Sequence, residues 1–483
     1  MSLPSTIAKN TTYLSLSSIF QKLLAFWWFS YIAAQLGENW MGRYIFALGF
    51  TGIFVIFMNF GLIPVLTREG AKRPDQLPAL LNTIISLKVF LTALSLITMF
   101  SVFYILNLFK ELPTATIQLV YMASIIIVID TFRSIVLAVL RAHQAMQYEA
   151  IGQFLYQLVV VGCGDVMLWL GYGAMGLIIA ISIASCFYLL YSVIIVLRRY
   201  NIAWQWQWDT TIIKRLIRLA IPFALADIFF KLNGSVDTVM LEYLAGDRFV
   251  TWYNIALKLT VTLTVIPGAF ATAFFPAMSR AVQHSTVELQ AIFERAMEYL
   301  LIISLPIACG TAVLAPTIIA VGFPAFPAAT IALQIFMAGL VFIFINYPIG
   351  NLLNAANRQG TNTLNMGIAL LVNIVLNSIL ISQYTYVGAA IAAVVSSVVL
   401  VVLGLPHVYQ IVQFNIQALL WRFVKTLVAS VVMAGSVLWL QPYLSLLGLV
   451  GIGIVIYGLV LYLLRGISWS ECQQLYRSLL SRT

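Results

Sequence analysis

The sequence predicts an all-α polytopic membrane protein with about 14 transmembrane helices, arranged as two pseudo-symmetric six-helix lobes plus two C-terminal helices. Three observations predict this fold class: an apolar composition, a series of long apolar runs, and an internal repeat. Hydrophobic residues make up 62% of the 483 residues, and charged residues make up only 9%. Such a composition is typical of a chain whose solvent is lipid, and it excludes soluble folds.

Each apolar run is long enough for a helix that crosses a bilayer, which needs about 20 residues. In order, the runs cover residues 12–36, 43–66, 80–108, 115–140, 149–171, 174–197, 216–243, 249–275, 296–321, 329–355, 362–383, 386–411, 421–440 and 443–464. The first run contains Lys22 and is followed by no small-residue cleavage pattern. We therefore expect it to remain as helix 1 rather than to be removed as a signal peptide.

Similar strings recur about 210 residues apart, in the same order, which indicates a duplicated unit. IFQKL in the first half reappears as IFFKL in the second. The matched positions are Lys22 and Lys231, Gly37 and Gly246, and Tyr172 and Tyr386. The predicted organisation is an N-terminal lobe (1–200), a C-terminal lobe (201–415), two additional helices (416–466) and an amphipathic cytoplasmic tail (467–483).

Most of the 26 lysines and arginines lie at the termini or in the even-numbered loops. By the positive-inside rule this places both termini in the cytoplasm of a multi-pass protein in the cytoplasmic (inner) membrane. The net charge of +10 then reflects topology, and we do not expect nucleic-acid binding. The linker around Trp204, Trp206 and Trp208 combines tryptophans with cations, which is typical of the headgroup layer.

The sequence offers no sign of a catalytic, metal or cofactor site. No G-x-x-x-x-G-K-[ST] string occurs, so the chain cannot use ATP by that motif. Its four cysteines and three histidines are scattered rather than spaced as metal ligands or as a disulfide framework. We therefore look for function in the polar groups within the apolar runs.

Five cations fall within the runs, where an isolated charge costs about 2.5 to 3.5 kcal/mol and normally faces a cavity or a partner. They are Lys22, Lys88, Arg133, Lys231 and Lys258.

Most of these cations have a structural alternative. Lys88 lies near the start of its run, from where its ammonium group can reach the cytoplasmic surface. Arg133 follows Asp130 by three residues, and Lys231 follows Asp227 by four, so that each pair can be neutralised within one helix.

Two observations argue that some charged residues within the runs do more than neutralise a neighbour on the same helix. Lys22 has Ser18 where Lys231 has Asp227, so the lysine is present in both halves while its neighbour differs. Asp237 has no obvious partner on its own helix, which makes it the first candidate for a coupling-ion site. The alternative is that Asp237 only hydrogen-bonds a neighbouring helix.

Polar residues also form a stripe on the eighth run, where Thr251, Asn254, Lys258 and Thr262 share one helical face. Such a stripe lines either water or another helix. Asparagines in the tenth and eleventh runs are typical of contacts between helices. Bends are predicted at Gly61 with Pro64 and at Pro267 with Gly268.

At this point the chain resembles a known family: the oligosaccharide-lipid flippases of the multidrug/oligosaccharidyl-lipid/polysaccharide exporter superfamily. The strings that carry the resemblance span most of the chain. They are Leu36–Leu48, Asn59–Glu69, Val236–Lys258, Phe275–Arg280 and Tyr386–Ala392.

The resemblance implies two six-helix lobes around a central cavity that opens alternately to each leaflet. It implies that cavity cations hold the diphosphate and the sugar acids of a polyprenyl-diphosphate-linked oligosaccharide. Lys22, Lys231 and Lys258 match cavity helices by position, and Arg43 would be a gate residue. The second repeat has Trp252 where the first has Arg43, so the gate would not be symmetric. The candidate substrate-binding residues are Lys22, Lys231, Lys258, Arg43, Asn254 and Arg133.

Two other functions remain open. A drug antiporter of the same superfamily would have this fold, but cationic drugs favour an acidic cavity, whereas the cations here slightly outnumber Asp130, Asp165, Asp227 and Asp237. A membrane glycosyltransferase or polymer ligase would need a large outer loop with catalytic carboxylates, and the first outer loop covers only residues 37–42. The expected partners are lipid-linked oligosaccharide, membrane lipids, H⁺ or Na⁺, and a polysaccharide polymerase. The candidate ion-coupling residues are Asp237, Asp227 and Asp130.

Overall fold

The computed structural model describes residues 3–200 and 205–466, with the side chains in these ranges other than those of residues 3–20, 22, 23, 74, 226 and 230. Within these ranges the chain is α-helical apart from short turns and one 3₁₀ turn, and it contains no strand. Trp204 and the predicted amphipathic tail (467–483) lie outside the described residues. The predicted all-α fold class is confirmed.

Eleven helical segments of the described part are long and apolar enough to cross a membrane. Two of them each contain two of the predicted runs. Helix α1 (Leu3–Asn59) covers the first run and most of the second, and α12 (Gln359–Tyr409) covers the eleventh and twelfth. The number of 14 crossings stays a prediction.

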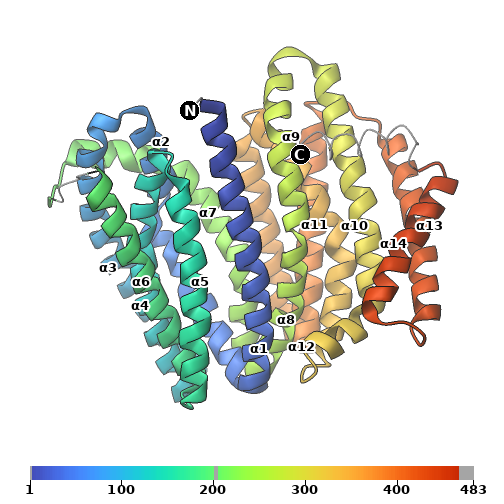
Figure 1. Cartoon of the computed structure of the whole chain (residues 1–483), viewed down its shortest axis with the longest axis horizontal. Helices are drawn as coiled ribbons and strands as arrows, with labels where there is room; N and C mark the ends of the chain where they lie inside the picture. Colours follow the sequence, from blue (N-terminus) through green and yellow to red (C-terminus); the bar gives the residue numbers. More distant parts are fainter. Residues whose placement is uncertain (1–2, 201–204, 467–483) are drawn as a thin grey trace. The chain divides into compact units, whose positions relative to one another are not determined.

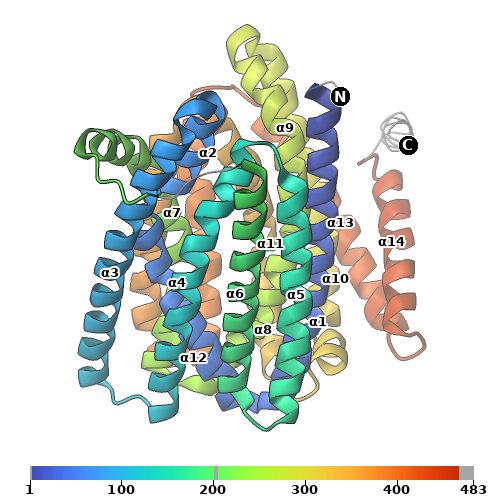
Figure 2. The same ribbon diagram turned by 60° about the vertical axis from the view of Figure 1, so that its left-hand side comes forward.

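The chain divides into two compact units, Met1–Thr251 and Trp252–Thr483. The first contains α1, α2 (Leu62–Lys72), the 3₁₀ turn η1 (Pro74–Gln76), α3 (Leu77–Phe109), α4 (Thr114–Ala142), α5 (Met146–Trp169), α6 (Gly173–Tyr200), α7 (Thr210–Leu244) and the start of α8 (Asp247–Leu263). Helix α6 packs between α4 and α5, and α1 packs on α4, α5 and α7 (Figures 1 and 2). Buried side chains of α2, α3, α4, α6 and α7 form one apolar core.

The second unit contains the rest of α8, α9 (Val265–His284), α10 (Thr286–Gly322), α11 (Ala329–Ala355), α12, α13 (Ile416–Leu440) and α14 (Leu446–Leu463). Helix α11 packs against α9, α10 and α12. The last two helices pack on α10, where Leu314 meets Met433 and Leu449 in a small apolar cluster (Figure 1).

Backbone breaks recur at repeat-related positions of the two halves. Gly37 and Gly246 both have positive φ, at 71° and 106°. Gly171 and Thr385, which precede the matched tyrosines, have φ of 82° and 52°, and Gln144 and Asn357, which follow α4 and α11, have φ of 56° and 59°. Positive φ costs conformational energy in most residues other than glycine. Its recurrence supports a duplicated unit, although the lobe boundaries stay a prediction.

The two predicted bends are present. Phe60 and Gly61 separate α1 from α2 with φ of 41° and 65°. A Cβ at Gly61 would lie 2.5 Å from the carbonyl oxygen of Ala220, so glycine also allows α2 to pack closely on α7. The second break, at Thr264, separates α8 from α9 just before Pro267.

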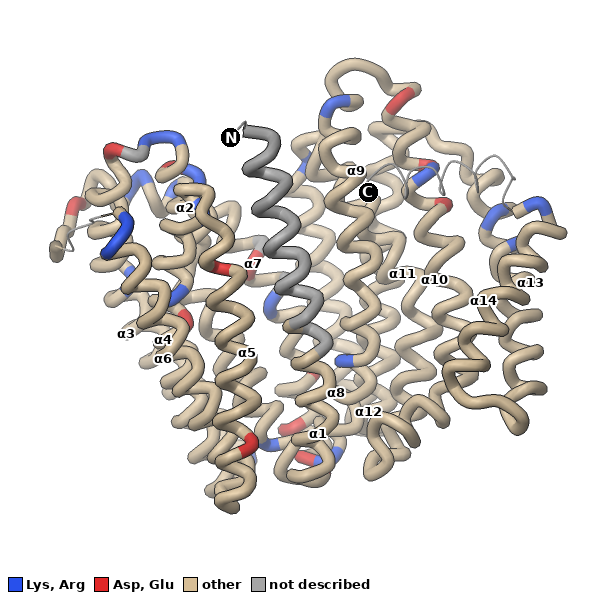
Figure 3. Tube along the Cα trace, in the orientation of Figure 1, with Lys and Arg blue, Asp and Glu red and all other residues tan. Residues whose placement is uncertain are grey.

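The outer surface of the helices is apolar, as a lipid-facing surface requires. Large side chains such as Phe109, Trp169 and Trp439 are exposed at 85%, 85% and 74%, each at or near a helix end. Tryptophan at these positions is typical of the membrane interface. Charged residues gather toward the ends of the helices, with few between (Figure 3).

Candidate functional site

Lys231 and Asp227 lie on α7, and both side chains are exposed. The ammonium group of Lys231 lies beside α1, because a Cβ at Gly52 would be only 3.4 Å from its Nζ. Among the described ion pairs, none joins Lys231 to Asp227. The alternative in which these two residues neutralise each other is therefore not the observed arrangement.

Lys258 is exposed on α8, and Asn254, one turn before it, is partly buried. Thr262, one turn after Lys258, donates a hydrogen bond to its carbonyl oxygen at 2.8 Å. Lys22, the repeat-related lysine, lies within α1, and its side chain is outside the described residues.

Arg43 ties α1 to the start of α8. Its Nε donates to Oδ2 of Asp247 at 2.7 Å, and its guanidinium group lies over the ring of Trp40 at 5.2 Å. Thr251 adds a second link, because its hydroxyl group donates to the carbonyl oxygen of Glu38 at 2.6 Å. We call these contacts the α1–α8 junction.

Arg133 is neutralised inside the first unit. Its Nη1 lies 3.0 Å from Oδ1 of Asp130. The guanidinium group also lies over the rings of Tyr156 and Tyr188, at 5.2 and 4.8 Å, and such stacking is favourable when the cation is desolvated. This geometry supports the structural alternative for Asp130 and Arg133.

Lys88 is fully buried, so the alternative in which its ammonium group reaches the cytoplasmic surface does not hold. Its Nζ donates to Oδ1 of Asn59 at 2.7 Å, to the carbonyl oxygen of Thr131 at 2.8 Å, and to the hydroxyl oxygen of Ser134 at 3.1 Å. Three acceptors from α1 and α4 replace water around the ammonium group, which removes the reason to extend toward solvent.

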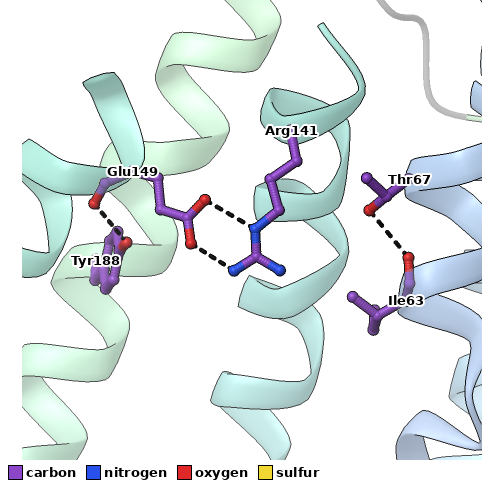
Figure 4. Close-up of polar contacts among 5 residues, drawn as sticks. All are labelled: Ile63, Thr67, Arg141, Glu149 and Tyr188. Atoms are coloured by element: carbon purple, nitrogen blue, oxygen red, sulfur yellow. Dashed lines mark hydrogen bonds and ion pairs between the residues drawn. The ribbon is translucent and has the colours of Figure 1, made fainter. Parts of the chain in front are cut away.

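The sequence reasoning missed an ion pair that joins α4 to α5. Arg141 Nε donates to Oε2 of Glu149 at 2.8 Å, and Tyr188 donates to the carbonyl oxygen of Glu149 at 3.0 Å (Figure 4). The available signal was a pair of opposite charges at the facing ends of two consecutive runs.

Glu242 was also missed, although it lies inside the seventh run. It is 2% exposed in the last turn of α7, and Asp237, farther back on the same helix, is 5% exposed. The signal was a third carboxylate in one apolar run, after Asp227 and Asp237, because such a group rarely lies in lipid without a function.

Glu69 ties α2 to α7 at the opposite end of the first unit. Burial alone would raise the pKa of its carboxyl group, but a hydrogen bond from Lys72 and the charges of Lys72, Arg215 and Arg68 lower this pKa overall. The ion pairs to Lys72 and Arg215 measure 3.2 and 3.0 Å. The carboxylate therefore stays charged and, through Arg215, holds the start of α7 against α2.

Among the residues that the structure describes, no group of three or more histidine, cysteine, aspartate or glutamate side chains is placed to hold a metal ion. Of the candidate binding residues whose side chains are described, Lys231 and Lys258 are exposed, on α7 and α8.

Comparison with known proteins finds similar sequences and similar folds. A probable low-salt glycan biosynthesis flippase, Agl15 of Haloferax volcanii, is 22% identical over 472 residues, which is 94% of each chain. The structure is similar to that of the lipid II flippase MurJ in an inward closed conformation, with a TM-score of 0.76 and 17% identity over 97% of this chain and 99% of that chain. It is also similar to an inward-facing multidrug MATE transporter of the MOP superfamily, with a TM-score of 0.69 and 15% identity over 85% of this chain and 98% of that chain.

These structural matches show the fold that the motifs implied, which is shared by flippases and drug transporters. The family model described as polysaccharide biosynthesis protein matches residues 7–282. Because this match covers more than half of the sequence, the chain belongs to the polysaccharide biosynthesis protein family.

Proposed function

We propose that the protein flips polyprenyl-diphosphate-linked oligosaccharides from the inner to the outer leaflet of the cytoplasmic membrane by alternating access, for cell-surface polysaccharide synthesis. Both termini lie in the cytoplasm in this proposal. The observation that carries it is the exposure of Lys231 and Lys258 on helices of a polysaccharide biosynthesis protein. Ammonium groups there provide hydrogen-bond donors and positive charge for a diphosphate, which needs both to cross hydrocarbon. Lys22 is the third proposed diphosphate ligand.

The experiment is reconstitution of the purified protein into lipid vesicles that contain a polyprenyl-diphosphate-linked oligosaccharide with a fluorescent sugar. We expect the protein to move the labelled lipid between leaflets, measured by the fraction that a membrane-impermeant reagent can quench. A rate no faster than that of protein-free vesicles would contradict the proposed function.

The antiporter alternative is supported by the similarity to the MATE transporter fold. The family match and the exposed lysines favour the flippase. Uptake of a cationic dye by the same vesicles, driven by a proton or sodium gradient, would favour the antiporter instead.

Flipping without a nucleotide site needs an ion gradient or consumption of the product, for which a polysaccharide polymerase is the proposed partner. We propose Asp237 as the residue that couples an ion. It lies on α7 with Lys231, and at 5% exposure its ionised form depends on neighbouring groups. Asp130 is ion-paired with Arg133, which makes it the weaker candidate, and the exposed Asp227 has less need of a bound ion.

We expect Asp237→Asn to make flipping independent of an imposed proton or sodium gradient, while the thermal stability in detergent changes little. The amide keeps the shape of the side chain and, like the protonated acid, carries both an acceptor and a donor, but it cannot take up or release a proton. Asp227→Asn, on the same helix, is the control and should retain the gradient dependence. Unchanged gradient dependence in the Asp237→Asn vesicles would show that this residue is not the coupling site.

A further inference from the structure

Glu242 is a buried carboxyl group without enough hydrogen-bond donors. Its residue is 2% exposed, and its Oε2 accepts no hydrogen bond. The neighbouring carboxyl group is that of Asp247, five residues farther along the chain, whose negative charge acts on the Glu242 side chain. Oδ1 of Asp247 is also buried and accepts no hydrogen bond. Each of the two carboxyl groups thus has one buried oxygen that lacks a hydrogen-bond donor among the described residues.

The cations near this pair already donate hydrogen bonds to atoms other than Oε2 of Glu242. Arg43 of α1 donates to the other oxygen of Asp247 at 2.7 Å. Lys110, which follows α3, donates to the carbonyl oxygens of Glu242 and Tyr243 at 2.7 and 3.0 Å, and thus caps the end of α7. The geometry therefore leaves the Glu242 carboxyl group with a positive field from Arg43 and Lys110 but with no described donor on Oε2.

A proton on Glu242 removes both the repulsion between the two carboxylates and the lack of a hydrogen-bond donor. Two ionised carboxylates in contact repel each other, and a buried oxygen without a donor loses its hydration without compensation. A protonated Glu242 becomes a donor, and the ionised Asp247 is its acceptor. Hydrogen bonds of this kind, between a carboxylic acid and a carboxylate, are short and strong.

The pair lies at a tight contact between the bend of α1 and the start of α8. A Cβ at Gly42 would lie 1.9 Å from the carbonyl oxygen of Asp247, so the two backbones touch at this point. The hydrogen bond of Thr251 to Glu38 is part of the same junction. Any repulsion that moves Asp247 therefore acts directly on the α1–α8 junction.

We propose that Glu242 is a proton-binding site that controls this junction. With the proton bound, Glu242 donates to Asp247, Asp247 holds Arg43, and the junction stays closed. When the proton leaves, a second negative charge beside Asp247 separates the end of α7 from the start of α8, and the junction loosens. In identifying the junction as the outer gate of a flippase, the proposal rests on the proposed function.

Glu242→Gln tests the site, because glutamine donates to Asp247 at every pH and cannot ionise. The measurement is hydrogen–deuterium exchange of the peptides that cover residues 36–44 and 244–251, as protection factors, from mildly acidic to alkaline pH. We expect protection in the wild-type protein to fall as the pH rises, and protection in Glu242→Gln to stay high throughout. Glu111→Gln removes an exposed carboxylate beside Lys110 and should behave like the wild type.

The proton itself is visible in the wild-type protein by infrared spectroscopy. We expect a carbonyl stretching band of a protonated carboxyl group that shifts in D₂O, disappears at alkaline pH and is missing from Glu242→Gln. An identical fall in protection in the wild type and in Glu242→Gln, or a band that the substitution leaves intact, would overturn the proposal. Neither measurement requires transport, so a failure of the flipping assay would be a separate result.

Discussion

Replacing Lys258 by alanine is expected to reduce polysaccharide export strongly while the amount of protein in the membrane stays normal. Lys258 is exposed on α8, so its removal leaves no cavity in a packed core. A charge-assisted hydrogen bond contributes about 1.5–3 kcal/mol, and its loss corresponds to a fall of about 10- to 100-fold in the flipping rate. The measurements are surface polysaccharide in cells that depend on this protein, and lipid flipping in vesicles.

Two matched variants show whether the effect belongs to this position and to its charge. Lys258→Arg keeps the charge and should restore part of the activity, because guanidinium also binds phosphate. Lys214→Ala removes an exposed cation from the start of α7 and should leave export unchanged. Normal export from each single alanine variant of Lys22, Lys231 and Lys258 would rule out binding of the diphosphate by these lysines.

The largest effect on stability is expected from Lys88→Ala. The substitution leaves a cavity in place of a fully buried side chain, and it leaves Asn59, Thr131 and Ser134 without the donor that they share. Cavity formation and the loss of three buried hydrogen bonds from a charged donor together should destabilise the first unit by about 3 kcal/mol or more. The measurement is the unfolding temperature of the purified protein in detergent, which should fall.

Lys72→Ala is the control for this change. Lys72 has a side chain that is 53% exposed, and its ion pair with Glu69 lies on the surface. Exposed pairs of this kind contribute about 0–1 kcal/mol, so the unfolding temperature should change little. If Lys88→Ala unfolded at the same temperature as Lys72→Ala, the three hydrogen bonds of Lys88 would not stabilise the protein.

The helices that carry the candidate binding residues, and two of the bends between helices, could be predicted from the sequence. Lipid requires long apolar helices, so the runs alone identified the helices that carry Lys231 and Lys258. Glycine and proline mark places where a helix must bend, and the breaks at Gly61 and near Pro267 followed from them. The break at Thr385 was not predicted, because threonine has no preference for positive φ, and only its match to Gly171 in the other half indicates it.

The partners of the buried charges could be read from the sequence only where both residues lie on one helix, and even then not reliably. Asp130 and Arg133 do pair, whereas Asp227 and Lys231, at a similar spacing, do not. The contacts of Lys88 with Asn59 and of Arg43 with Asp247 join residues 29 and 204 positions apart. Sequence spacing carries no information about such neighbours.

The sequence by itself determined the fold class, the duplicated strings and the set of charges that lie within apolar runs, because each follows from composition or from the period of one helix. Only the tertiary structure decided which of those charges are neutralised. It buried Lys88 among three acceptors, stacked Arg133 on two tyrosines, and left one buried oxygen each of Glu242 and Asp247 without a donor. The physical reason is that the free energy of a charge in a membrane protein depends on the donors, acceptors and water within a few ångströms, and packing between helices brings these together.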